Sequence, residues 1–69
     1  MNTERLIYMA NQIARNFAVQ GEEAAIEQTA SHIVDFWDPR MKAAIAECGD
    51  EGLDDVAKKA IERLRGLTS

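Results

Sequence analysis

The sequence predicts an all-α fold, a small bundle of three to four helices, and two observations carry this prediction. Apolar residues recur at three- and four-residue steps through most of the 69 residues, which is the spacing of one helix face. Alternating β-branched runs and two-residue hairpin signals are both missing from the sequence, so we expect no sheet. A chain of this length forms one domain at most, and we expect residues 1–69 to make a single helical domain.

The first helix is expected over about residues 4–20. Thr3 is placed to cap its start, and Gly21 follows as a left-handed stop. The apolar side is formed by Leu6, Ile7, Ala10, Ile13, Ala14 and Phe17, with Met9 on its flank. The other side is rich in amides and poor in charge, and consists of Asn11, Gln12, Arg15 and Asn16. This side is either a contact surface or an ordinary exposed face.

The second helix is expected over about residues 22–37, and a tight Asp-Pro corner separates it from the third. The residue before a proline is disfavoured in the helical region, so Asp38 ends the second helix. Asp38 is also a good N-cap, and Pro39 suits the first position of the third helix. That third helix carries Met41, Ala44, Ile45 and Cys48 on one side.

A loop and a fourth helix complete the prediction. Gly49, Asp50, Glu51 and Gly52 form the loop. Asp54 can cap a helix over about residues 54–65, and Gly66 follows near its end. The basic residues of this segment, which we interpret as a solvated face, are Lys58, Lys59, Arg63 and Arg65.

Composition argues against nucleic acid and membrane as partners. The net charge is −4, and no lysine or arginine occurs between Arg15 and Arg40, so an electropositive footprint for phosphates is missing. No segment approaches the roughly 20 apolar residues that span a bilayer, and the N-terminus lacks a signal-peptide pattern. Cys48 is the only cysteine, which fits a reducing compartment. We expect a cytoplasmic protein.

The sequence offers no catalytic, cofactor-binding or metal site. His32 is the only histidine, and a hydrogen bond to Asp35, three positions later, explains it more economically than metal binding or catalysis. Cys48 falls in an apolar register and is expected to be a small buried residue. The four glycines are scattered and form no phosphate-binding loop. We therefore expect no enzymatic activity and no cofactor in this chain.

Rare side chains gather around the Asp-Pro corner. Phe36 and Trp37 are adjacent, so on a helix they point about 100° apart, and one can be core while the other reaches outwards. Trp and Arg are enriched at binding hot spots, and Trp37 and Arg40 lie on either side of the corner. The alternatives are that Trp37 is the main core anchor and that Arg40 pairs with Asp38 or Asp35.

Two runs carry a resemblance to a known family. The first is Met9-Ala10-Asn11-Gln12-Ile13-Ala14, and the second is His32-Ile33-x-x-Phe36-Trp37-Asp38-Pro39-Arg40-Met41. Together with the Gly52-Leu53-Asp54 start of the last helix, they resemble the delta subunit of soluble, NAD-dependent, molybdenum-containing formate dehydrogenases. The resemblance spans about Leu6 to Leu64.

The resemblance implies a small, cofactor-free accessory subunit. Its expected partner is the large alpha subunit, which carries the molybdopterin guanine dinucleotide cofactor and iron–sulfur clusters, and its role is assembly or stability of the complex. The marker positions carried over are Met9, Asn11, Gln12, His32, Phe36, Trp37, Asp38, Pro39, Arg40 and Met41. The candidate partner-binding residues among them are Met9, Asn11, Gln12, His32, Phe36, Trp37 and Arg40. One departure is the missing proline at the Gly21-Glu22-Glu23 junction.

Three alternatives accompany this hypothesis. The chain could be a transient maturation factor for the same enzyme. It could also be an unrelated regulatory or DNA-binding helical module, since the corner superficially forms a helix-turn-helix, although the second helix lacks arginine and the corner is acidic. An enzymatic role is the third alternative, and the sequence also leaves self-association of the isolated chain open.

Overall fold

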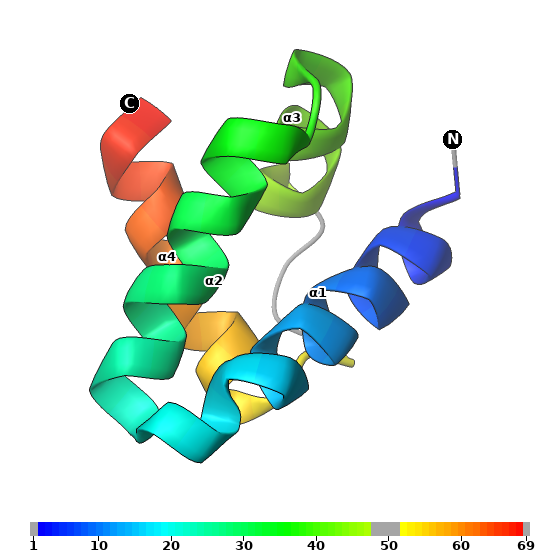
Figure 1. Cartoon of the computed structure of the whole chain (residues 1–69). Helices are drawn as coiled ribbons and strands as arrows, with labels where there is room; N and C mark the ends of the chain where they lie inside the picture. The colour runs from blue at the N-terminus through cyan, green and yellow to red at the C-terminus, as the bar shows by residue number, and fades with distance from the viewer. Residues whose placement is uncertain (1, 48–51, 69) are drawn as a thin grey trace.

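The computed structural model describes residues 2–47 and 52–68, which contain four α-helices and one 3-10 turn (Figure 1). These are α1 (Thr3–Phe17), η1 (Ala18–Gln20), α2 (Glu22–Phe36), α3 (Pro39–Glu47) and α4 (Asp55–Thr68). Those two ranges contain no strand, so the all-α prediction is confirmed. In Figure 1, α1 and α2 meet at η1 and diverge away from it, α4 runs behind α2, and α3 lies beyond the far end of α2.

The start of α1 differs from the prediction by one residue. Asn2, not Thr3, is the N-cap, and its Oδ1 accepts hydrogen bonds from the backbone N–H groups of Glu4 at 2.9 Å and Arg5 at 3.4 Å. Asn caps helices at least as well as Thr, so the earlier residue takes the position and Thr3 becomes the first helical residue. Both Asn2 and Thr3 are residue types that cap helices, and the hydrogen bonds to the Asn2 side-chain oxygen identify Asn2 as the cap.

The junction between α1 and α2 depends on Gly21. The α-helix ends at Phe17, before the expected residue 20, because its last turn tightens into η1. Gly21 then adopts a φ of +101°, which strongly favours glycine. Its N–H donates to the Ala18 carbonyl and its carbonyl accepts from the Ala25 N–H, so Gly21 closes η1 and opens α2.

Two residues connect α2 to α3. Trp37 has extended backbone angles of φ −88° and ψ 140°, and so α2 ends at Phe36, one residue earlier than expected. The Asp38 carboxylate accepts from the Met41 N–H at 2.9 Å, and its carbonyl accepts from the Lys42 N–H at 3.0 Å. These two bonds have the geometry of an N-cap, and Pro39 is the first residue of α3.

The last helix is longer than predicted. The Asp54 carbonyl accepts from the Lys58 N–H at 2.7 Å, and α4 then continues to Thr68, beyond the expected residue 65. Gly66 therefore lies inside the helix instead of ending it, at a propensity cost of about 1 kcal/mol relative to alanine. The expected burial of Cys48 and most of the expected loop, residues 49–51, lie outside the described residues.

The core is built largely from alanine and a few branched residues. The main cluster consists of Leu6, Ala10, Ala14, Ile33, Trp37, Ile45, Ala57, Ile61 and Leu64. A second cluster between α2 and α4 consists of Ile26, Ala30 and Ala60. Small side chains allow the helices to approach closely, but each one removes little apolar surface from water. The described core is therefore compact and adds little stability per residue.

Polar contacts hold α4 against its neighbours. Lys59 pairs with Glu22 of α2 at 2.7 Å, and the Arg65 Nε donates to the Ala46 carbonyl of α3 at 2.8 Å. A longer pair joins Arg63 to Glu23 at 3.7 Å. Lys59, Arg63 and Arg65, which the sequence assigned to a solvated face, thus also bind groups on neighbouring helices. The hydrogen bond and charge of Glu22 raise the pKa of Lys59 above its usual value.

Candidate partner-binding surface

Trp37 lies in the core and not on the surface. Its side chain is 5% exposed and belongs to the main cluster with Leu6 and Ile33. The extended backbone at Trp37 ends α2 and turns the indole inward, away from the direction that Phe36 takes on the helix. Of the two alternatives for Trp37, the structure favours the core anchor, and the indole offers a partner almost no area in this conformation.

Phe36 takes the outward position. Its side chain is 74% exposed, and its ring lies against the His32 imidazole with centroids 4.7 Å apart and planes tilted by 35°. The two residues are one helical turn apart, so their rings lie above one another on one face of α2. The expected hydrogen bond from His32 to Asp35 is wrong: both side chains are described, and no such bond joins them. The imidazole packs on Phe36 instead.

Asn11 uses its amide inside the chain. Its Nδ2 donates to the Gly52 carbonyl at 2.8 Å, and its Oδ1 accepts from the Asp54 N–H at 2.8 Å. The contact is close, because a Cβ atom on Gly52 would lie 3.3 Å from the Ile7 Cγ2, and Gly52 has a φ of +88°. Asn11 therefore ties the middle of α1 to the start of α4.

Arg40 and Gln12 are the polar candidates on the outside. Arg40 is exposed, and among the described residues it forms no ion pair with Asp35 or Asp38. The local pairing that the sequence suggested for Arg40 is thus not formed. Gln12 is half-buried on α1, one turn after Met9.

The buried side of α1 divides its surface into two flanks. The buried stripe is formed by Leu6, Ala10 and Ala14. Asn11 lies on the flank that faces the start of α4, where it bonds to Gly52 and Asp54. Met9 and Ile13 lie one turn apart on the opposite flank, half-buried against the core. That second flank points away from α4.

The surface of α2 is divided in the same way. Ile26 and Ala30 pack against Ala60 of α4, whereas His32 and Phe36 lie on the other flank of the helix. α1 packs against α2, and each of the two helices carries a flank turned away from α4. We call the side chains on these two flanks the outer edge: Met9, Ile13, His32 and Phe36.

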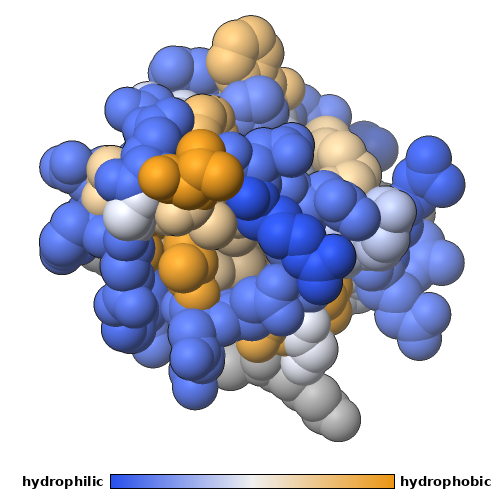
Figure 2. All heavy atoms as spheres, turned by 60° about the horizontal axis from the view of Figure 1, so that its bottom comes forward, coloured by the Kyte–Doolittle hydropathy of each residue, from blue (hydrophilic) through white to orange (hydrophobic). Residues whose placement is uncertain are grey.

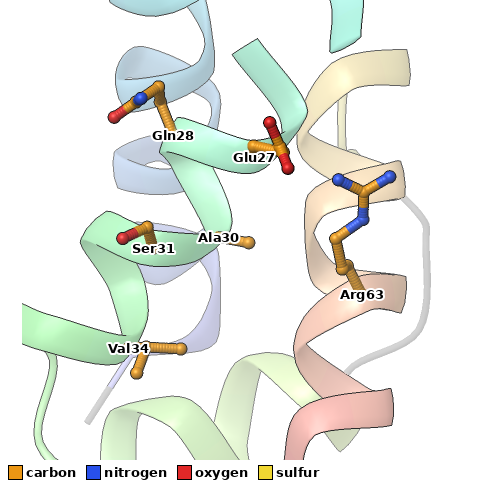
Figure 3. Close-up of a pocket in the computed structure, with 6 residues that line it drawn as sticks. All are labelled: Glu27, Gln28, Ala30, Ser31, Val34 and Arg63. Atoms are coloured by element: carbon orange, nitrogen blue, oxygen red, sulfur yellow. The ribbon is translucent and has the colours of Figure 1, made fainter. Parts of the chain in front are cut away.

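A shallow hollow lies on the other flank of α2 (Figure 3). It measures about 450 Å³ and is lined by Glu27, Gln28, Ala30, Ser31, Val34 and Arg63. Glu27 of α2 and Arg63 of α4 point toward one another across it, and Gln28 points away from α4. Both charged side chains stand in open solvent, so the hollow lacks the dry surroundings in which acid–base chemistry is tuned.

Sequence reasoning missed the exposed apolar side chains of Tyr8 and Val19. Tyr8 is 63% exposed on α1 and Val19 is 90% exposed on η1. Both positions lie outside the apolar helix register. An apolar residue at such a position is expected to be exposed, and this was the sequence signal that could have identified them. On the face that Figure 2 shows, apolar side chains form a short run between hydrophilic ones, so the apolar surface there is narrow.

In the described part of the chain, no helix is both long and apolar enough to cross a bilayer. Within the same residues, no three His, Cys, Asp or Glu side chains come together in an arrangement that could hold a metal ion.

Comparison with known proteins gives one match. Residues 5–61 match the model of a protein family described as NADH-dependant formate dehydrogenase delta subunit FdsD. The matched range includes α1 from Arg5 onwards, all of α2 and α3 and the first half of α4, and with them every candidate partner-binding residue. No curated protein and no solved structure matches the chain.

Proposed function

Because this chain belongs to the delta-subunit family of NADH-dependent formate dehydrogenases, we propose that it is a non-catalytic accessory subunit of such an enzyme. It binds the large alpha subunit in the cytoplasm and supports assembly or stability of the complex. The alpha subunit carries the molybdopterin guanine dinucleotide and the iron–sulfur clusters, and the oxidation of formate to carbon dioxide with formation of NADH takes place on other subunits. We assign no cofactor to the delta chain itself.

The family match over residues 5–61 is the observation that carries this proposal. The architecture supports it, because four short helices around an alanine-rich core give a chain of this size modest stability. A partner that binds only the folded form adds to that stability by mass action. The exposed Phe36 supports it further, since a protruding aromatic side chain is a common anchor at protein interfaces.

Co-purification tests the proposal. An affinity-tagged copy of the chain, expressed from its native locus, should retain the formate dehydrogenase subunits in fixed stoichiometry after size-exclusion chromatography. A deletion strain should lose formate oxidation or show reduced molybdenum content in the purified enzyme. Normal activity and normal cofactor content in the deletion strain would refute the accessory role.

The same experiment separates a permanent subunit from a transient maturation factor. A permanent subunit remains in the finished, active complex at one copy per alpha subunit. A maturation factor is found on the inactive precursor and is absent from the active enzyme. Detection of the chain only on the precursor would replace our proposal with the maturation role.

A further inference from the structure

We propose that Phe36 is the anchor of the contact with the larger subunit, and that it enters an apolar recess on that subunit with the outer edge around it. This inference rests on the proposed function, because the family match is what supplies a larger protein partner. It deepens that function by naming the surface, the central side chain and the shape of the opposing site.

Two neighbours restrict Phe36 before any partner binds. The next residue, Trp37, is held in the core, and the ring of Phe36 packs on His32 at 4.7 Å. A side chain that is already ordered loses little conformational entropy on binding. With 74% of its surface exposed, Phe36 has a large apolar area that remains to be buried. Both conditions favour a hot-spot residue.

The surroundings of Phe36 combine apolar and polar side chains. Met9 and Ile13 are the apolar members of the outer edge on α1, the amides of Gln12 and Gln28 are neighbours along the helices, and the exposed Asp35 and Arg40 are the charged neighbours of Phe36. Interface centres are depleted of charged residues and enriched in aromatic residues and Met, with polar groups at the rim. The outer edge itself contains an aromatic residue, a Met and no carboxylate, lysine or arginine, and Asp35 and Arg40 lie at its rim.

The family match decides between a larger subunit and a second copy of this chain, because a delta subunit is one of several subunits of its enzyme. A protruding ring needs a recess on the opposing surface. A second copy offers the hollow between Glu27 and Arg63, whose charged walls do not suit a phenyl ring, and a smaller one of about 380 Å³ lined by Pro39, Lys42, Ala43 and Ala46. We take the larger subunit as the occupant, with an apolar recess for Phe36, and sedimentation tests the second copy.

Binding measurements on three variants test the anchor. The purified chain is titrated into formate dehydrogenase isolated from a strain that lacks it, and dissociation constants are measured by calorimetry. Phe36→Ala should weaken binding by about 10–100-fold, and Phe36→Leu should weaken it less because part of the apolar volume remains. Tyr8→Ala is the matched control, since Tyr8 is a similarly exposed aromatic side chain outside the outer edge, and should change binding by less than about threefold.

Each outcome is informative. All three variants should keep the circular dichroism and melting temperature of the parent, because both rings are mostly exposed. If the parent binds and Phe36→Ala binds equally well, the anchor is wrong and the proposed function stands. If the parent does not bind, the proposed function fails and this inference fails with it. A parent dimer in sedimentation that Phe36→Ala dissociates would identify a second copy as the occupant and overturn the inference.

Discussion

Replacing Asn11 tests whether its side chain stabilises the fold, as the structure indicates, or contacts a partner, as the sequence suggested. The sequence resemblance suggested Asn11 as a candidate partner residue, yet both ends of its amide form hydrogen bonds within the chain, to the Gly52 carbonyl and the Asp54 N–H. Replacing Asn11 with alanine removes both bonds, which join residues more than forty positions apart in the sequence. The start of α4 then loses its polar tie to α1.

The expected loss can be worked out from the two bonds. Each intramolecular hydrogen bond contributes a net 0.5–1.5 kcal/mol, and water replaces part of this at an exposed position, so we expect the pair to contribute about 1–2 kcal/mol. Alanine also returns about 0.5 kcal/mol through its higher helix propensity. Asn16 supplies the control, because it is an exposed amide on the same helix and gains the same propensity term when replaced by alanine. The difference between Asn11→Ala and Asn16→Ala should therefore be about 1–2 kcal/mol.

Thermal and urea unfolding followed by circular dichroism measure this difference. For a domain of this size, it corresponds to a melting temperature about 4–16 °C lower for Asn11→Ala than for Asn16→Ala. Well below the transition, both variants should bind formate dehydrogenase like the parent chain. Equal stability of the two variants, together with weaker binding by Asn11→Ala, would refute our assignment and place Asn11 in the interface.

Three further predictions follow from single contacts. Thr29→Val should raise the free energy of unfolding, measured in urea, by about 1 kcal/mol, because the buried Thr29 Oγ1 has no hydrogen-bond partner among the described residues. A lower free energy of unfolding would instead show that the Thr29 hydroxyl forms a hydrogen bond. Arg40→Ala should leave the melting temperature of the free chain nearly unchanged and weaken complex formation by about 1–3 kcal/mol in calorimetry, and equal losses in both would favour a structural role. Glu22→Gln should lower the Lys59 pKa back toward 10.5 in an NMR titration, because Glu22 raises it in the parent chain. The contribution of this pair to the stability of the fold is present below pH 10.5 and is lost as the pH rises through the higher pKa of Lys59 in the folded chain.

Much of the fold follows from the sequence because its signals are local. The three- to four-residue spacing of apolar positions depends only on neighbours within one helix, and it predicted all four helices and the absence of strands in the described ranges. The boundaries were less accurate. At the start of α1 two adjacent residues could both cap, and only the geometry of Asn2 decided between them. Gly66 was taken as a stop, but α4 passes through it.

The candidate surface was predictable only in part, because it depends on contacts between helices. The sequence showed that Phe36 and Trp37 could not both face the core, but the extended backbone at Trp37 was needed to decide which one does. The amides of Asn11 and Gln12 looked alike in sequence. Their different roles depend on the position of Gly52, which no local pattern reveals. His32 was paired with Asp35 on spacing, although Phe36 is equally close along the helix and offers a ring.

The markers around the turn from α2 to α3 separate into two groups once their contacts are known. Trp37 is buried, and the Asp38 carboxylate bonds to the start of α3, so the fold itself explains both. Phe36 and Arg40 are exposed: the Phe36 ring packs on His32, and Arg40 forms no ion pair with Asp35 or Asp38 in the described residues. The turn fixes the backbone positions of both residues, because Phe36 ends α2 and Arg40 belongs to the first turn of α3. We therefore predict that a partner binding at this turn contacts the exposed Phe36 ring and the exposed Arg40 side chain, and leaves Trp37 and Asp38 to the fold.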